Sequence, residues 1–442
     1  MLSPISDKTF FLQVFGCQMN EHDSERIAGM LESLGAIQVP ELEESEIVVF
    51  VTCCVREAAD TRLMGQVASM KNIPLPQSSK LDKRIVCIGG CIGQRDGAKL
   101  MEKLSHVDVV FGTQNIDRLP RLIESVLVGK GHQAEVYEAS EKFATDLPSK
   151  RVHAWAAWLP ITSGCNNFCT YCIVPYVRGR EKSRTIEDVT AEAQALVNDG
   201  VKEITLLGQN VNSYGKDLEE PLDFADLLER VNAVPGDFLI RFMTSHPKDA
   251  TQKLFETMAR CGKVAPVLHL PFQAGNDRVL RAMNRHYDRA QYLDEVRRLK
   301  ELIPDIVLTS DVIVGFPGET TEEFEETLSL LEQEELTPQR RLALMRELKK
   351  LTGRMEWLVE ALLKMAQLDA GTVVFHPQDT TAAELVRRAA EPLEVPMEVR
   401  SIRFTAQAGE ERLTCDVPWS TEALGNILKN CMEHAASWVQ VT

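Results

Sequence analysis

Long apolar segments are the first feature that this sequence of 442 residues lacks. No uninterrupted apolar run reaches the roughly 18 residues of a membrane-spanning helix. The first residues also have no basic stretch leading into an apolar one, as a secretory signal would have. A surplus of basic residues is missing too, since the formal net charge is −16. This excludes a polyanion-binding protein held by bulk charge, because phosphate neutralisation needs clustered lysine and arginine. The net charge does not exclude a local basic patch.

A cysteine content high enough for a disulfide scaffold is also missing, because eleven cysteines are too few for this length. With 44% hydrophobic and 26% charged residues, the composition is that of an ordinary globular protein. The length suggests about three domains. We therefore expect a cytoplasmic protein with no membrane segment, in which grouped cysteines are metal ligands or redox groups.

Short apolar runs alternate with helical patterns along most of the chain, which predicts an α/β fold. In the first third, strands are expected at 10–15, 46–51, 84–88 and 107–111, and a helix at 24–34. These elements predict an N-terminal domain with a parallel sheet. After a polar linker at 139–150, strands are expected at 157–161, 203–207, 238–242, 267–270 and 306–308, and a helix at 190–197. Strand–helix units in a row predict a barrel or part of one.

Cys165, Cys169 and Cys172 form the most specific local signal, a C-x3-C-x2-C run just after an expected strand. Three thiolates on one tight loop can hold three irons of a [4Fe-4S] cluster and leave the fourth iron open. An open iron chelates a small ligand, whereas a closed four-cysteine site suits electron transfer. The alternative is that three structural cysteines share this spacing by chance.

A second set, Cys17, Cys53 and Cys91, is dispersed, and each member follows an expected strand of the N-terminal sheet. Because the carboxyl ends of parallel strands lie at one edge, where ligands bind, the three loops are expected to converge. They would then hold a second cluster with another open iron. The alternative is that these are buried structural cysteines. The other five are expected to have no such role: Cys54, Cys87, Cys261, Cys415 and Cys431.

Residues 10–335 resemble the radical S-adenosylmethionine (SAM) methylthiotransferases, and most of all the tRNA 2-methylthio-N6-isopentenyladenosine synthases. The segments that carry this resemblance occur in order over about three quarters of the chain. They are GCQMN at 16–20, TCCVRE at 52–57, GCIGQR at 90–95, FGTQN at 111–115, GCNNFCTYC at 164–172, VPYVRGRE at 174–181, LGQNVNSYG at 207–215, TSHP at 244–247, HLP at 269–271 and VGFPGET at 314–320.

The resemblance implies a mechanism with two [4Fe-4S] clusters. The cluster on the 165–172 loop would bind SAM through its free iron and cleave it to a 5′-deoxyadenosyl radical. The three dispersed cysteines would hold an auxiliary cluster that carries or supplies sulfur, and a second SAM would supply the methyl group. The product would be a methylthio group at C2 of N6-isopentenyladenosine 37 in tRNA. An electron donor such as a flavodoxin or ferredoxin is implied as a partner.

Further site residues follow from the same resemblance. It implies SAM contacts from residues of the cluster loop and of strand-end loops, namely Tyr171, Gly208, Gln209, Asn210, Ser245, Gly315, Gly318 and Glu319. Glycines there would let the backbone approach a ligand, with simple turn chemistry as the alternative. Arg178, Arg180 and Arg184 form a basic run that would bind RNA phosphate or the SAM carboxylate. A solvated charged face is the alternative.

At about 331–336 the resemblance stops, and neither a final barrel strand nor the basic RNA-binding β-barrel called TRAM is found. Apolar residues at 344, 348, 351, 355, 358, 362 and 365 form a heptad seam, which predicts a helix that can pair in a homodimer. Residues 336–371 resemble the dimerisation helix of sensor histidine kinases, and 421–435 resemble the kinase N-box. Asn426 and Asn430 would then face Mg-ATP from one side of a helix. No histidine lies between His286 and His376, so the tail is not a complete kinase.

The sequence thus predicts three domains: 1–145 with the auxiliary cluster, 151–335 with a partial radical SAM barrel, and 336–442 as a kinase-like fragment. The last is either a dimerisation element or a fusion that is not native. The main functional hypothesis is methylthio transfer to tRNA, impaired if the altered C-terminus matters. The rivals are an inactive fusion or signalling protein with a cluster-binding relic, and a methylthiotransferase for threonylcarbamoyladenosine in tRNA or for a ribosomal protein.

Overall fold

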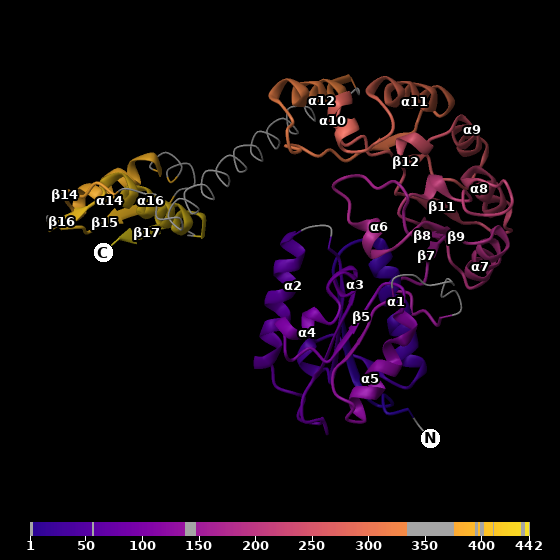
Figure 1. Cartoon of the computed structure of the whole chain (residues 1–442), viewed down its shortest axis with the longest axis horizontal. Helices are drawn as coiled ribbons and strands as arrows, with labels where there is room; N and C mark the ends of the chain where they lie inside the picture. The colour runs from indigo at the N-terminus through magenta and orange to yellow at the C-terminus, as the bar shows by residue number, and fades with distance from the viewer. Residues whose placement is uncertain are drawn as a thin grey trace. The chain divides into compact units, whose positions relative to one another are not determined.

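The computed structural model describes residues 3–54, 57–137, 147–333, 375–393, 397, 402–409, 411–434 and 438–441. The chain divides into two compact units, residues 1–334 and 335–442 (Figure 1). Among the described helices, none is both long and apolar enough to cross a membrane. The finer division of the first unit at residues 145 and 151 stays a prediction.

A six-stranded parallel sheet in the order β2-β1-β3-β4-β5-β6 forms the N-terminal half of the first unit. Its strands are β1 (Thr9–Val14), β2 (Ile37–Gln38), β3 (Ile47–Thr52), β4 (Ile85–Gly90), β5 (Val109–Phe111) and β6 (Gln133–Glu135). Its helices are α1 (Gln18–Ser33), α2 (Glu57–Ser69), α3 (Cys91–Asp96), α4 (Lys99–Lys103) and α5 (Leu119–Leu127). The four predicted strands are confirmed to within two residues at each end.

Side chains of β3 alternate between two hydrophobic clusters, which explains why both faces of this sheet are covered. On one face, Val49 packs with Ile27 of α1 and Leu122 of α5, together with the strand residues two positions before and after it. Phe50 packs on the other face with Leu63 of α2. Every residue of β3 is buried, as expected for a strand of a parallel sheet with helices on both sides.

The second half of the first unit is an open parallel barrel segment. Strands β7 (Ala156–Pro160), β10 (Glu203–Leu207) and β11 (Leu239–Phe242) form one parallel sheet, and β12 (Val267–His269) and β13 (Val307–Thr309) form another. A parallel bridge joins Ile240 to Val264, between β11 and β12. The main helices are α7 (Ile186–Asn198), α8 (Phe224–Ala233), α9 (Gln252–Arg260), α10 (Asp277–Ala282), α11 (Arg289–Leu302) and α12 (Thr321–Gln333).

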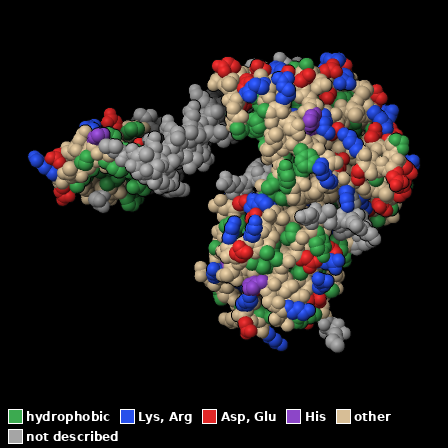
Figure 2. Space-filling view, viewed as in Figure 1, with side chains coloured by type: hydrophobic (Ala, Val, Ile, Leu, Met, Phe, Trp, Pro, Cys, Tyr) green, Lys and Arg blue, Asp and Glu red, His purple; other side chains and the backbone are tan. Residues whose placement is uncertain are grey.

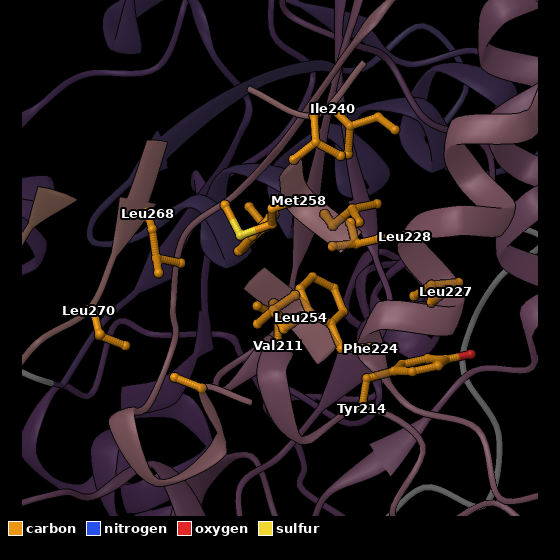
Figure 3. Close-up of a cluster of buried hydrophobic side chains, with 14 of the residues drawn as sticks. Val211, Tyr214, Phe224, Leu227, Leu228, Ile240, Leu254, Met258, Leu268 and Leu270 are labelled. Atoms are coloured by element: carbon orange, nitrogen blue, oxygen red, sulfur yellow. The ribbon is translucent and has the colours of Figure 1, made fainter. Parts of the chain in front are cut away.

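The core of this barrel segment lies between its strands and helices. Figure 3 shows Ile240 of β11 and Leu268 of β12 together with Leu228 of α8 and Met258 of α9. All four side chains are buried. The predicted partial barrel is thus present as five strands, each followed by a helix. A final strand would follow α12, where the chain lies outside the described residues, so its expected absence stays a prediction.

Two predicted helices begin earlier than expected, for local reasons. The helix predicted at 24–34 begins at Gln18, directly after the extended residue Cys17. The helix predicted at 190–197 begins at Ile186, because the Thr185 side chain accepts a hydrogen bond from the Asp188 amide and caps it.

The second unit has its own small core, with residues such as Ala389, Leu428 and Met432. Its described elements are β14 (Gln378–Thr381) antiparallel to β16 (Arg412–Cys415), β15 (Arg403–Ala406) parallel to β17 (Trp438–Val441), α14 (Ala382–Ala390) and α16 (Val417–His434). Both Asn426 and Asn430 lie on α16, so the predicted helix there is confirmed. The heptad at 344–365 and most of the 139–150 linker lie outside the described residues.

Candidate functional site

The three-cysteine loop follows β8 (Thr162–Ser163), a short strand paired with β9 (Lys182–Ser183), and ends at α6 (Val174–Val177). Gly164 starts the loop with φ +81° and lies so close to the next turn that a Cβ would stand 2.6 Å from the Gly179 carbonyl oxygen. The Cys165 amide donates to that same oxygen at 3.1 Å. Glycine is therefore required for the loop to close on itself.

Residues beyond α10 hold the loop from its other side. The Asn284 side chain donates to the carbonyls of Asn167 and Phe168, at 3.1 and 3.0 Å. The buried guanidinium of Arg285 lies 3.6 Å from the Cys169 sulfur. Sequence reasoning missed Asn284 and Arg285, because they lie more than 110 residues from the loop and belong to no spacing pattern.

The three thiols of this loop lie mostly out of contact with solvent. Cys165 and Cys169 are buried and Cys172 is partly so. Burial raises the pKa of Cys165 to about 11, so cluster binding must release its proton. Within the described residues, no three cysteine, histidine or acidic side chains converge as ligands of one metal ion. A [4Fe-4S] cluster needs a wider arrangement, because each thiolate binds a different iron.

Buried polar atoms without a partner gather in the loops that follow β7, β10 and β11. They are Thr162 Oγ1, Asn210 Oδ1, Ser245 Oγ and His246 Nε2. A buried polar atom left unpaired is costly, so a group of them can receive a polar ligand or water. Burial, with nearby Arg285, lowers the pKa of His246 to about 2, which keeps its ring neutral. These atoms fit a polar molecule such as SAM.

The predicted SAM contacts divide into two groups. Gln209 accepts a hydrogen bond from the Gly164 amide at 2.5 Å, so the loop after β10 braces the cluster loop. A Cβ at Gly208 would overlap the side chain of Thr162, the first residue of β8. The backbone at Gly208 therefore packs directly against that side chain. Tyr171, Asn210 and Ser245 complete this first group: Tyr171 is 40% exposed on the cluster loop, and Asn210 and Ser245 carry unpaired atoms.

The loop after β13 forms the second group and is held by its own hydrogen bonds. Glu319 accepts from the amides of Gly315 and Phe316, at 2.7 and 3.2 Å. Arg278 donates to the Gly318 carbonyl. These bonds give Glu319 a structural role in the loop, and a contact of Gly315, Gly318 or Glu319 with SAM stays a prediction.

The dispersed cysteines lie at one edge of the N-terminal sheet. Neighbouring strands β1, β3 and β4 are in register, with Thr52 opposite Gly90, so Cys53 and Cys91 follow directly at matching positions. Gly16 has φ +121°, and a Cβ there would overlap Cys53, so the loop that carries Cys17 packs against Cys53. The three loops converge as expected, and the ligand role of their sulfurs is a proposal.

Cys54 was expected to have no ligand role, and that expectation stays a prediction, although Cys54 lies beside one member of this set. Its thiol donates a hydrogen bond to the Cys91 sulfur. This bond and the charge of Arg178 lower the pKa of Cys91 to about 6, against the effect of burial. Both interactions favour the thiolate form of Cys91.

The basic run 178–184 does not form the predicted RNA-facing patch. Arg178 and Arg184 are only 5% and 4% exposed, and each pairs with a carboxylate, from Asp23 and Glu192 respectively. Their guanidiniums therefore have no surface to offer an RNA phosphate. Arg180 is exposed, with its guanidinium 4.4 Å from the centre of the Phe168 ring. On the face drawn in Figure 2, basic and acidic side chains are interspersed.

The partial barrel and its three-cysteine loop define a radical SAM enzyme, and the comparisons agree. Residues 159–331 match the Radical SAM superfamily, and residues 9–112 match Uncharacterized protein family UPF0004. Two solved structures share the fold at 13% identity with a TM-score of 0.52: the cobalamin-dependent S-adenosylmethionine radical enzyme OxsB and the radical S-adenosylmethionine methyltransferase TsrM from Kitasatospora setae. Each match covers 74% of this chain, with 52% of OxsB and 73% of TsrM.

Curated relatives narrow the class. A tRNA-2-methylthio-N(6)-dimethylallyladenosine synthase of Clostridium botulinum (strain Loch Maree / Type A3) is 47% identical over 328 residues, which is 74% of this chain and 72% of the relative. The one of Alkaliphilus oremlandii is 46% identical over 329 residues, 74% of this chain and 69% of the relative. The chain belongs to the family of tRNA-2-methylthio-N(6)-dimethylallyladenosine synthases.

Proposed function

We propose that this chain adds a methylthio group to C2 of N6-isopentenyladenosine 37 in tRNA, the base that the names of its relatives call dimethylallyladenosine. One observation carries the proposal. A single compact unit gathers two sets of three cysteines, one on a tight loop of the barrel and one at three adjacent strand ends. Each set suits a [4Fe-4S] cluster with one open iron. The names of the relatives favour this substrate over a threonylcarbamoyl adenosine or a ribosomal protein.

The chemistry of the substrate explains why such sites are needed. The C2–H bond of an adenine has no acidic proton for a protein base to remove. When bound by the 165–172 loop, a [4Fe-4S] cluster supplies the electron that cleaves SAM and so provides the radical that abstracts this hydrogen. The chain contributes positioning: Gln209 braces the loop, and the unpaired polar atoms of Thr162 and Ser245 offer hydrogen bonds to SAM.

Contact with tRNA is assigned to the exposed side chains near the cluster loop. Arg180 stacks on Phe168, and Tyr176 is 75% exposed beside it with its ring 6.1 Å from that of Phe168. A guanidinium with neighbouring aromatic rings suits stacking on an unpaired base and contact with phosphate. The overall acidity of the chain makes such local contacts more important, because bulk charge repels RNA.

The remaining partners are proposed on sequence alone. A flavodoxin or ferredoxin would supply the electron, and the heptad at 344–365 would pair two chains, as in the kinase segments it resembles. A cytoplasmic location goes with this proposal, since none of the eleven cysteines, all of which lie in the described residues, forms a disulfide. Sedimentation of the full chain tests the dimer: a monomer at micromolar concentration would rule it out.

The division of labour between the two cysteine sets is tested by anaerobic reconstitution and iron counting. Wild-type protein should hold about eight irons. Cys169→Ala and Cys53→Ala should each lower this to about four, but SAM cleavage should be lost in Cys169→Ala and kept in Cys53→Ala. Buried Cys261 provides the control, and its replacement by alanine should leave iron and cleavage unchanged. A wild-type protein with no cluster would end the proposal.

A further inference from the structure

Arg178 carries a buried charge and has no role in the function proposed above. Its guanidinium donates to Asn20 Oδ1 at 2.8 Å and to Asp23 Oδ2 at 3.1 Å, and both partners are buried. Arg178 follows the cluster loop, whereas Asn20 and Asp23 lie on α1 just after Cys17. The bonds thus join segments more than 150 residues apart.

The same guanidinium faces the dispersed cysteines. Asn20, which accepts from this guanidinium, lies beside Gly16 and Cys53, and α3, which begins at Cys91, packs against α6, which ends one residue before Arg178. In this position the guanidinium favours the thiolate of Cys91 and lowers its pKa. Asp23 is the carboxylate that balances it: burial opposes ionisation of Asp23, but Arg178 lowers its pKa. Neighbouring His22 adds no charge, because burial lowers its pKa.

Because Arg178 is buried, its charge can change the reduction potential of a cluster bound beside it. A charge in a desolvated site acts on its neighbours far more strongly than one in water. Three thiolates on a [4Fe-4S] core with two positive charges leave one net negative charge, which reduction increases by one. A nearby guanidinium therefore favours the reduced state, and hydrogen bonds to cluster sulfurs are known to tune the potential in the same sense.

We propose that Arg178 is a positioning residue for the auxiliary cluster: it orients the Cys91 sulfur and sets the reduction potential of the cluster, with Asp23 moderating its charge. This inference rests on the proposed function, because it takes Cys17, Cys53 and Cys91 as the ligands. The basic run 178–184, which was predicted to bind RNA, then contributes one arginine to the auxiliary cluster site.

Arg184 is a matched control from the same segment. It is equally buried, donates to the Pro160 carbonyl at 3.0 Å and pairs with Glu192 at 2.7 Å. Its interactions are with the first strand of the barrel and with α7, away from the dispersed cysteines. Replacing it by glutamine removes a buried charge and disturbs folding to a similar degree, but should not change the auxiliary cluster.

The test uses the full chain with the cysteines at 165, 169 and 172 changed to alanine, so that only the auxiliary cluster binds. After anaerobic reconstitution, iron content and the potential from an electron paramagnetic resonance titration are measured. Arg178→Gln should lower the potential, Arg178→Lys should restore part of it, and Asp23→Asn should raise it. Arg184→Gln should keep the potential of the parent.

Opposite shifts for Arg178→Gln and Asp23→Asn are a signature that general destabilisation cannot produce. Loss of iron in Arg178→Gln with retention in Arg184→Gln would support the inference as well. Equal potentials in all variants, or equal loss of iron from Arg178→Gln and Arg184→Gln, would overturn it. Absence of iron from the parent protein would instead refute the ligand set, and with it the proposed function.

Discussion

Gly164 offers the sharpest test of how the backbone builds the cluster loop. At φ +81°, an L-residue costs about 1–2 kcal/mol relative to glycine. The added Cβ would also overlap the Arg180 carbonyl, and forcing an atom into a packed site costs about 1–3 kcal/mol more. The native loop conformation is thus destabilised by about 2–5 kcal/mol in the variant. Because 1.4 kcal/mol is a tenfold change in an equilibrium constant, the population of that conformation falls strongly. Gly164→Ala should therefore move Cys165 away from its bond to Gly179.

Iron counting measures this effect directly. Gly164→Ala should hold about four irons in place of about eight, and should lose SAM cleavage while the auxiliary cluster stays. Gly200 is the control: its φ is +90°, but no atom lies within 4 Å of the position that a Cβ would take there. Gly200→Ala carries only the conformational cost and should keep both clusters. Full iron content and normal SAM cleavage in Gly164→Ala would refute the reasoning.

Two further predictions concern single side chains. Cys54→Ala should keep about four irons at the auxiliary site, because Cys54 only donates a hydrogen bond to Cys91; a loss of those irons in the iron assay would make it a ligand. Glu295 is buried, and burial raises its pKa to about 8, so the folded state keeps a proton that the unfolded state has lost between about pH 4.5 and 8. Stability therefore falls over this range. Glu295→Gln should raise the thermal midpoint at pH 8 more than at pH 5, and an equal change at both would contradict the burial argument.

The elements that the sequence predicted well are those governed by local patterns. The limits of β10 are those predicted, 203–207, because an apolar run bounded by polar residues is a local signal. Convergence of the dispersed cysteines followed from topology, since strand ends of a parallel sheet share an edge. The cysteine loop was visible from spacing alone.

Long-range pairing explains the failures. Arginines are usually exposed, so a run that contains Arg178 and Arg184 indicates a surface. Burial of Arg178 depends on Asp23, 155 residues earlier, and no local pattern shows that pairing. Arg285 reaches Cys169 across 116 residues in the same way. The interaction of Cys54 with Cys91 also joins two different strand ends, so no local pattern shows it.

Methylthio formation on tRNA tests the central claim most directly. The full chain, reconstituted anaerobically with iron and sulfide, is incubated with SAM, a reductant and tRNA that carries N6-isopentenyladenosine, and the nucleosides are then separated and identified by mass spectrometry. The account predicts 2-methylthio-N6-isopentenyladenosine with the wild-type protein and none with Cys169→Ala. A wild-type protein that holds about eight irons and cleaves SAM, yet leaves that nucleoside unmodified, would contradict it.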